Sequence, residues 1–263
     1  MPSKPKLGQN FLVDVQAAQR IAAALGELAG RTVVEIGPGQ GVITGTLAAR
    51  ARRVMAIELD RELAAGLRGR FKPERVTVIE QDVLQFDFAG AAREAGERLR
   101  VAGNLPYYIT SPILLKLAAS HAALGLAVLM VQREVADRVT AAPDSRDYGL
   151  LSVTAQMYGP VEQLFTLPPS AFSPPPQVHS TVIRWRFAPR FAELDVQEGG
   201  FLRFLRQAFA QKRKTLANNL RAAGVAPAVA AAALAQAGID AQARAEAVPI
   251  EALAALWRGL EEE

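Results

Sequence analysis

Glu35-Ile36-Gly37-Pro38-Gly39-Gln40-Gly41 is the stretch that decides the fold. It continues a short β-rich run, Thr32–Ile36, and it precedes a stretch of helical composition, Ile43–Arg50. Glycines between a strand and a helix permit a tight turn and let a ligand approach the backbone closely. The helix N-terminus adds unpaired N–H groups at the same place. The pattern predicts an α/β fold with a ligand site where this strand ends, although such turns also occur without ligands.

The alternation of β-rich runs with helical stretches continues through the first two-thirds of the chain. This alternation is typical of parallel strands joined by crossover helices, so it predicts a parallel sheet. The expected strands are Thr32–Ile36, Val54–Glu58, Val76–Glu80, Arg100–Gly103 and Ala127–Val131. The expected helices are Val15–Leu25, Ile43–Arg50, Arg61–Arg70 and Pro112–Ala119.

Two further strands, Val161–Thr166 and Ser180–Phe187, flank a turn-rich segment. Adjacent strands with such a connection predict an antiparallel edge on the otherwise parallel sheet. Residues 189–200 contain proline and paired glycines and are expected to form a linker, after which the sequence is helical. The chain is therefore predicted to have a Rossmann-like domain over residues 1–188 and a small all-helical domain over residues 201–263.

Composition excludes several classes of site. The chain has 263 residues, no cysteine and two histidines, so disulfides, thiolate chemistry and a histidine-built metal site are not expected. Residues 1–9 are polar and basic without a following apolar core of the signal-peptide type, and no apolar run reaches membrane-spanning length. A soluble, cytoplasmic protein without a metal or a membrane contact is expected.

Acidic residues mark the ends of the second and third expected strands. Glu58 can accept both ribose hydroxyls of a nucleoside, and Asp82 lies where an adenine amino group could be read. With Glu35 they surround the glycine turn, and such acids would repel the pyrophosphate of a dinucleotide. This charge pattern favours a cationic nucleoside such as S-adenosylmethionine, and hence methyl transfer. The alternative is that Glu58 and Asp82 are solvated loop carboxylates.

The fourth expected strand ends in Asn104-Leu105-Pro106-Tyr107. An amide oxygen and a backbone carbonyl can each accept one N–H of an exocyclic amino group, and an aromatic ring can stack on a flipped base. Pro106 holds the Leu105 carbonyl out of a helix. Strand ends of a doubly wound sheet share one edge, so this clamp would face the cofactor acids. An ordinary turn before proline is the alternative.

With these residues together, the chain closely resembles the KsgA family of ribosomal RNA small subunit adenine N6-dimethyltransferases. The resemblance runs from Leu7 to about Arg221. It is carried by Leu7-Gly8-Gln9-Asn10-Phe11-Leu12, Glu35-Ile36-Gly37-Pro38-Gly39-Gln40-Gly41, Gly103-Asn104-Leu105-Pro106-Tyr107-Tyr108, Val131-Gln132-Arg133-Glu134-Val135-Ala136, Phe172-Ser173-Pro174-Pro175-Pro176-Gln177-Val178 and Lys212-Arg213-Lys214-Thr215-Leu216.

The resemblance implies a class I methyltransferase domain, a helical RNA-binding domain and S-adenosylmethionine as the methyl donor. The implied cofactor contacts are Gln9, Asn10, Leu12, Gly37, Gly39, Glu58, Asp82, Val83 and Asn104. The implied catalytic residues are Asn104, Leu105, Pro106 and Tyr107, with Phe172 on the opposite face of the base. The implied substrate is small-subunit ribosomal RNA near its 3′ end, where two adjacent adenosines of a hairpin loop are each dimethylated at N6. The family is also linked to late small-subunit assembly.

At some of these positions, the residue type alone favours a structural role over the functional role that the resemblance implies. Without the resemblance, the segment before Leu12 would be read as a disordered arm, and Phe172 equally well as ordinary edge packing. Tyr108 is expected to be a core residue rather than a base contact. His179, beside a strand start, is expected to be structural.

Six basic residues and no acidic one lie between Phe201 and Arg221, in a chain of net charge +4. At helical spacing the leucines and Phe209 of this region share a stripe, which predicts one packed helix with a basic ridge beside it. The ridge residues are Arg203, Arg206, Arg213, Lys214 and Arg221. A solvated face is the alternative, but the attached base-modifying domain favours contact with RNA phosphates. The expected partner is small-subunit rRNA within the 30S particle, bound by a monomer.

Two rival functions remain on the sequence alone. The related large-subunit dimethyltransferases of the macrolide-resistance type have similar core motifs, but the segment 172–178 and the basic run 212–214 favour the small-subunit enzyme. A non-catalytic assembly factor on the same fold is the second rival, and the intact Asn104, Pro106, Tyr107, Glu58 and Asp82 argue against it.

Overall fold

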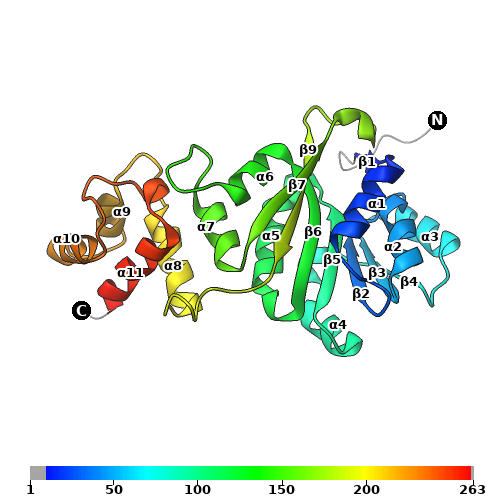
Figure 1. The fold of residues 1–263 in the computed structure, drawn as a ribbon, viewed down its shortest axis with the longest axis horizontal. Helices are drawn as coiled ribbons and strands as arrows, with labels where there is room; N and C mark the ends of the chain where they lie inside the picture. Colours follow the sequence, from blue (N-terminus) through cyan, green and yellow to red (C-terminus); the bar gives the residue numbers. More distant parts are fainter. Residues whose placement is uncertain (1–9, 262–263) are drawn as a thin grey trace. The chain divides into compact units, whose positions relative to one another are not determined.

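A computed structural model describes residues 10–261 of the chain. The chain forms two compact units (Figure 1). The first contains the residues through Ala136 together with Pro160–Ala188, and the second contains Asp137–Gly159 together with the residues from Pro189 onward. None of the described helices is both long enough and apolar enough to cross a membrane.

A seven-stranded sheet forms the centre of the first unit, in the order β4-β3-β2-β5-β6-β9-β7. Its strands are β2 (Thr32–Ile36), β3 (Arg53–Glu58), β4 (Val76–Glu80), β5 (Leu99–Asn104), β6 (Leu124–Gln132), β7 (Val161–Leu167) and β9 (Ser180–Arg186). The first five strands in this order are mutually parallel. Strand β9 lies between β6 and β7 and is antiparallel to both, which confirms the predicted antiparallel edge.

Helices cover both faces of the sheet (Figure 1). They are α1 (Val15–Ala24), α2 (Val42–Arg50), α3 (Arg61–Arg70), α4 (Phe88–Ala95) and α5 (Thr110–Ala119). Residues of α1 and α2 join inward-facing residues of the sheet in one buried apolar cluster. Asp14 begins α1 by accepting the Ala17 N–H at 3.0 Å, and Asp60 begins α3 by accepting two backbone N–H groups.

A two-stranded ribbon outside the main sheet was not predicted. Strand β1 (Phe11–Leu12) pairs antiparallel with β8 (Phe172–Ser173), with Leu12 opposite Phe172. Both of these side chains are buried in the apolar cluster that α1 and α2 share with the sheet. This pairing holds the backbone of the first described residues in a defined place, so residues 10–12 are not part of a disordered arm.

The second unit is helical. It contains α7 (Leu150–Met157), α8 (Glu198–Ala208), α9 (Leu216–Ala222), α10 (Pro227–Gln236) and α11 (Ile250–Glu261), while α6 (Arg133–Thr140) runs from the first unit into the second.

The predicted domain limits differ from these units at two places. Helix α8 begins at Glu198, inside the expected linker. Residues 137–159, predicted to belong to the first domain, pack within the second unit, where the Tyr148 hydroxyl donates to Val248 O at 3.4 Å. The Tyr158 hydroxyl likewise donates to Glu198 at 2.7 Å. The assignment of RNA binding to the helical part stays a prediction.

Candidate functional site

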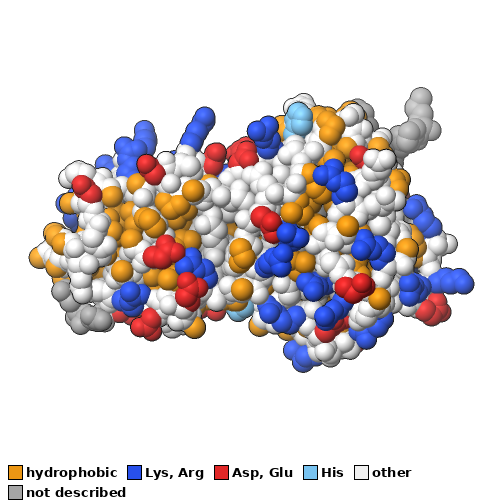
Figure 2. Space-filling model, in the orientation of Figure 1, with side chains coloured by type: hydrophobic (Ala, Val, Ile, Leu, Met, Phe, Trp, Pro, Cys, Tyr) orange, Lys and Arg blue, Asp and Glu red, His pale blue; other side chains and the backbone are white. Residues whose placement is uncertain are grey.

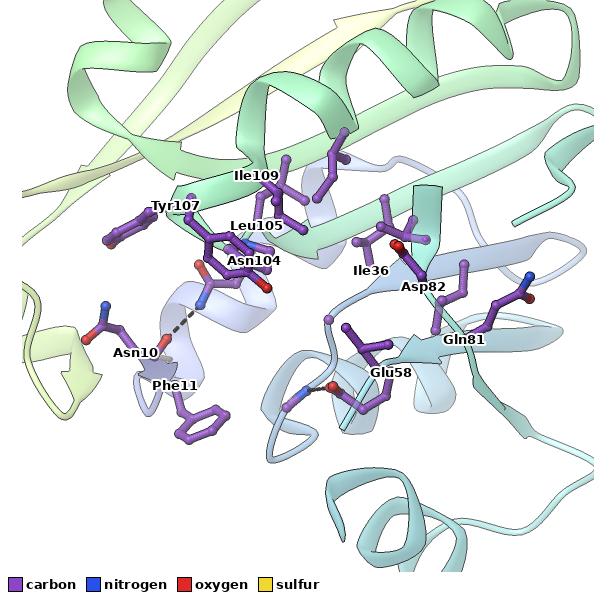
Figure 3. A pocket seen from close by; sticks show the side chains of 18 residues that line it. Asn10, Phe11, Ile36, Glu58, Gln81, Asp82, Asn104, Leu105, Tyr107 and Ile109 are labelled. Carbon is purple, nitrogen blue, oxygen red and sulfur yellow. Dashed lines mark hydrogen bonds between the residues drawn. The ribbon is translucent and has the colours of Figure 1, made fainter. Parts of the chain in front are cut away.

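The carboxyl edge of the parallel strands encloses a cavity of about 270 Å³ (Figure 3). Apolar side chains form most of its wall, and a few polar groups converge on it, as is usual for small-molecule sites. Residues predicted from the sequence that line the cavity are Asn10, Gly37, Gly39, Glu58, Asp82, Val83, Asn104, Leu105, Pro106 and Tyr107. Gln9 lies outside the described residues.

The glycine turn between β2 and α2 shapes one side of the cavity. Gly37 and Gly39 have φ angles of 63° and 54°, in the left-handed region that side chains disfavour. A Cβ at Gly39 would lie 2.7 Å from the ring of Phe11, which itself lines the cavity. The turn therefore needs glycine for backbone conformation and for close approach.

Glu58 ends β3 with its carboxylate at the cavity. One carboxylate oxygen accepts the Gly39 N–H at 3.0 Å and the other accepts the Asp60 N–H at 2.9 Å (Figure 3 shows the first bond). Burial of the carboxyl raises the pKa of Glu58, and the backbone N–H groups oppose that shift. Each oxygen keeps a further lone pair, so the group can still accept hydroxyl hydrogen bonds.

Asp82 follows β4 and begins the short 3₁₀ turn Val83–Gln85, whose Leu84 N–H it holds at 2.9 Å. Sequence reasoning missed the neighbouring wall residues Ile36, Ile57, Leu59 and Gln81. Each of them is adjacent in sequence to a residue at a strand end that was singled out. Their adjacency in the sequence to these residues could therefore have identified them.

Asn104 ends β5 with its side-chain orientation fixed. Its Nδ2 donates to the backbone carbonyl of Asn10 at 2.9 Å (Figure 3). A carbonyl can only accept, so this bond leaves Oδ1 as the acceptor atom of Asn104. The next peptide is also held, because the Leu105 N–H donates to Met130 O on β6 at 2.9 Å. Among residues 10–261, no hydrogen bond is found that uses the Leu105 carbonyl.

Pro106 has a φ of −58° and ψ of 128°, and the 3₁₀ turn Tyr107–Ile109 follows it. The Tyr107 hydroxyl lies 2.7 Å from Ser180 Oγ at the start of β9, which fixes the far end of the ring. Burial raises the pKa of the Tyr107 phenol, while the Ser180 contact lowers it. The phenol is therefore neutral at physiological pH and cannot act there as a base.

The family model described as "Ribosomal RNA adenine dimethylase" matches residues 2–261. The chain belongs to the ribosomal RNA adenine dimethylase family. Two similar proteins, both named "Ribosomal RNA small subunit methyltransferase A", come from Acidobacterium capsulatum and Koribacter versatilis. The first is 63% identical over 98% of this chain and 92% of its own length, and the second is 51% identical over 98% and 94%.

Solved structures show the same fold. The 23S rRNA methyltransferase ErmE is 26% identical, with a TM-score of 0.73 over 96% of this chain and 100% of its own. A dimethyladenosine transferase from Plasmodium falciparum has a TM-score of 0.81 at 21% identity, over 96% of this chain and 98% of its own. The predicted class I methyltransferase fold is confirmed.

A ribosomal RNA adenine dimethylase is an S-adenosylmethionine-dependent enzyme, and the cavity fits this donor. The positive φ angles of Gly37 and Gly39 open a cradle that a Cβ would fill, and Glu58 adds a carboxyl on the cavity wall that can accept ribose hydroxyls. No group of three or more His, Asp or Glu side chains suited to a metal ion occurs among the described residues.

Glu35 does not lie at the cavity, where the sequence predicted it together with Glu58 and Asp82. It is 1% exposed and does not line the cavity, because β2 is buried on both faces. Its Oε2 has no hydrogen-bond partner within the described part of the chain, and burial raises the pKa of Glu35 to about 8. The carboxyl is therefore protonated at neutral pH. The preference for a cationic nucleoside depends on Glu58 and Asp82 alone.

Two further residues of the dimethylase, Phe172 and Tyr108, differ from expectation. Phe172 is 3% exposed and does not line the cavity, because its strand β8 turns the ring into the apolar cluster. Leu12, its partner across the ribbon, is 5% exposed, but it also lines a small cavity beside Gly37, Gly39 and Asn104, so its implied cofactor contact stays a prediction. Tyr108 was expected in the core, but it is 58% exposed and lines the cavity.

The sequence predicted that the basic residues of the second unit share one helix. The structure instead divides them between two helices and a turn. Arg203 and Arg206 belong to α8 and Arg221 to α9, whereas Arg213 and Lys214 lie in the turn between these helices. All five are exposed.

Two polar side chains account for this break. The Asn219 side-chain amide is buried and donates to Ala208 O and Gln211 O, at 2.7 and 3.3 Å, which holds the end of α8. Thr215 then begins α9 by accepting the Asn218 N–H at 3.2 Å.

Proposed function

We propose that this dimethylase converts two adjacent adenosines in the 3′-terminal hairpin loop of small-subunit ribosomal RNA to N6,N6-dimethyladenosine. Two relatives named for the small subunit, at 63% and 51% identity, support this substrate over the large-subunit alternative, for which ErmE is 26% identical. The fixed orientation of Asn104 carries the chemical part of the proposal.

The clamp consists of Asn104 Oδ1 and the Leu105 carbonyl. The N6 lone pair of adenine is delocalised into the ring, which makes the nitrogen a poor nucleophile. When both N6 hydrogens are accepted by these two oxygens, a pyramidal nitrogen is favoured and its lone pair is directed out of the ring plane. Neither oxygen has to reorganise, because Asn10 O and Met130 O already hold the flanking donors.

The cofactor would be held by the glycine turn, Glu58, Asp82, Val83 and the backbone near Asn10. S-adenosylmethionine supplies a methyl group on a cationic sulfur. Glu58 would accept its ribose hydroxyls with the lone pairs that Gly39 and Asp60 leave. Rate is gained mainly from positioning within this cavity rather than from a charged catalytic group.

Tyr107 would stack on the flipped base. Its ring is held at the hydroxyl by Ser180 and at the backbone by the turn after Pro106, so it offers a rigid face. No dedicated base is needed, because the N6-protonated product is strongly acidic, and the neutral phenol of Tyr107 is consistent with this. Phe172 could cover the other face only if the ribbon β1–β8 moved, since its ring is buried.

The exposed Arg203, Arg206, Arg213, Lys214 and Arg221 would contact RNA phosphates. We place the reaction on the assembling 30S particle, with the protein acting as a monomer in the cytoplasm, where this RNA is processed.

The test uses isolated small and large ribosomal subunits that lack the modification, with labelled methyl donor. Mapping of the product should show two methyl groups on each of two adjacent adenosines near the 3′ end of the small-subunit RNA. Methylation of large-subunit RNA alone would contradict the proposal. An Asn104→Ala variant that still transfers methyl groups at the normal rate would contradict the role of the clamp.

A further inference from the structure

Five arginines gather at the edge of the sheet opposite the cavity. Arg31, Arg52 and Arg98 directly precede strands β2, β3 and β5, and Arg100 lies within β5. Arg186 ends the antiparallel strand β9 and so reaches the same edge. We call the set the amino-edge arginines: Arg31, Arg52, Arg98, Arg100 and Arg186. Figure 2 shows Lys and Arg side chains gathered over the lower part of the sheet on the face drawn.

The strand register places two of these arginines on one face. Leu126 of β6 pairs with Arg100 on one side and with Arg186 on the other. Directly paired residues of neighbouring strands point to the same face, so the Arg100 and Arg186 side chains lie on either side of Leu126. The backbones of the two arginines are roughly 10 Å apart, which is twice the spacing of neighbouring strands. Leu126 belongs to the apolar cluster on the α1 side, so both arginines lie at the end of that face.

Positive charge exceeds negative charge in this cluster. Glu97 accepts from Arg31 at 2.8 Å and from Arg52 at 3.5 Å, so two arginines share one carboxylate. Arg98 donates to two backbone carbonyls, which hold its guanidinium without neutralising it. Glu94 pairs with the neighbouring Arg53, and Glu162 pairs with Arg184 while also interacting with the charge of Arg186, so neither acid offsets the excess.

Arg100 shows the energetic consequence of this crowding. It is half-buried in a central strand, and its burial lowers the pKa of its guanidinium. The positive charges of Arg31, Arg186 and Arg98 lower it further, against the opposing effect of Glu97. A bound polyanion would relieve this repulsion, and the planar fork of arginine suits phosphate oxygens in particular.

We propose that the amino-edge arginines bind the phosphate backbone of the RNA substrate and form a second RNA-contact surface on the methyltransferase unit. The inference rests on the proposed function for the identity of the polyanion. Arg100 and Asn104 are four residues apart on β5, or about 13 Å along the strand. A nucleic-acid duplex carries about one charge per 1.7 Å of its axis, so an RNA held at the cavity offers many phosphates within that distance.

The test compares two double variants that remove the same charge from exposed positions of the same unit. Arg31→Gln with Arg186→Gln removes two amino-edge arginines. Arg68→Gln with Arg93→Gln removes two arginines that pair singly with Glu80 and Asp87, and it serves as the matched control. Binding of transcribed small-subunit rRNA is measured over a range of monovalent salt concentrations.

The amino-edge double variant should bind about tenfold more weakly at low salt. Its plot of log affinity against log salt should lose about 1.4–1.8 of slope, since each lost phosphate contact removes ~0.7–0.9. The control should match the wild type, and both variants should keep their affinity for S-adenosylmethionine. If the double variant fails to fold, Arg186→Gln alone should lose about half of that slope.

Equal slopes for the two double variants would overturn the proposal. So would an unchanged affinity for RNA combined with a lost affinity for vesicles of anionic lipid, because the cluster would then contact a membrane. A failure of the proposed function would be seen separately, as wild-type protein that binds RNA but leaves the small-subunit adenosines unmethylated.

Discussion

The side-chain amide of Asn104 donates to the backbone carbonyl of Asn10 at 2.9 Å, and this single bond determines which atom of Asn104 can accept. The proposed acceptor clamp is therefore oriented before any substrate arrives.

Replacement of Asn104 by Ala should lower kcat by about 100- to 1000-fold, the usual cost of one preorganised polar contact to a reacting group. Affinity for S-adenosylmethionine should change by much less, since the glycine turn and Glu58 remain. Single-turnover methylation with saturating cofactor and RNA measures this directly. A variant that lost cofactor binding in step with kcat would show that Asn104 acts mainly on the cofactor.

Tyr107→Phe and Tyr107→Ala distinguish the role of the Tyr107 hydroxyl from the role of its ring. Phe keeps the ring and loses only the contact with Ser180, so kcat should fall by no more than about tenfold. Ala removes the stacking face, at ~1–3 kcal/mol, and should mainly weaken binding of the target RNA. Ser180→Ala serves as the matched control and should resemble Tyr107→Phe. A larger effect of Phe than of Ala would contradict a stacking role.

The buried carboxyl of Glu35 should make the free energy of unfolding depend on pH. Its pKa is about 8 in the folded protein and 4.5 when exposed, so the folded state binds the proton more tightly. Its contribution is fully present below pH 4.5 and is lost as the pH rises to about 8. Over that window the unfolding free energy of the wild type should fall by a few kcal/mol relative to Glu35→Gln, which does not titrate. Urea unfolding of both proteins at several pH values measures the difference, and parallel curves would contradict the assignment.

Gly103→Ala should destabilise the first unit. A Cβ at Gly103 would lie 2.6 Å from the backbone oxygen of Ile36, its partner across β2 and β5, and a backbone atom cannot move aside cheaply. A loss of about 1–3 kcal/mol is expected. Gly66→Ala is the contrasting variant, because nothing lies within 4 Å of its Cβ in helix α3, and it should add about 1 kcal/mol. Thermal unfolding should place the two variants on opposite sides of the wild type.

Arg213→Gln with Lys214→Gln should weaken RNA binding to a similar degree for every RNA sequence, because phosphate contacts carry no sequence information. The salt slope should fall by ~1.4–1.8. The exposed Gln207→Ala tests whether any change in this unit has the same effect. A loss confined to the target hairpin would indicate base contacts instead.

Much of the fold could be predicted because its signals are local. Strand–glycine–helix succession and apolar runs identified the strands of the parallel sheet and its antiparallel edge. The ribbon of β1 with β8 could not be predicted, because it joins residues 11–12 to residues 172–173 and depends on tertiary packing. That pairing is also why Phe172 is buried away from the cavity.

Residues on the cavity wall were predicted wherever a residue type and a strand end coincided, as at Glu58 and Asn104. Glu35 was misread because a strand buried on both faces gives no alternation that shows where its acid points. The break between α8 and α9 did have a local signal, since Thr215 is a favourable helix N-cap. Residues 201–221 therefore form parts of two helices, where one helix was predicted.

The bond from Asn104 reaches a main-chain oxygen, and every amino acid supplies that atom at position 10. Evolutionary drift of the side chain at this position therefore leaves the acceptor geometry intact, so long as the β1–β8 ribbon keeps the backbone on its path. A saturation library at residue 10 would consequently leave the orientation of the Asn104 amide unchanged. A library at the ribbon's buried pair, Leu12 and Phe172, would instead test whether the ribbon is needed to orient the Asn104 amide.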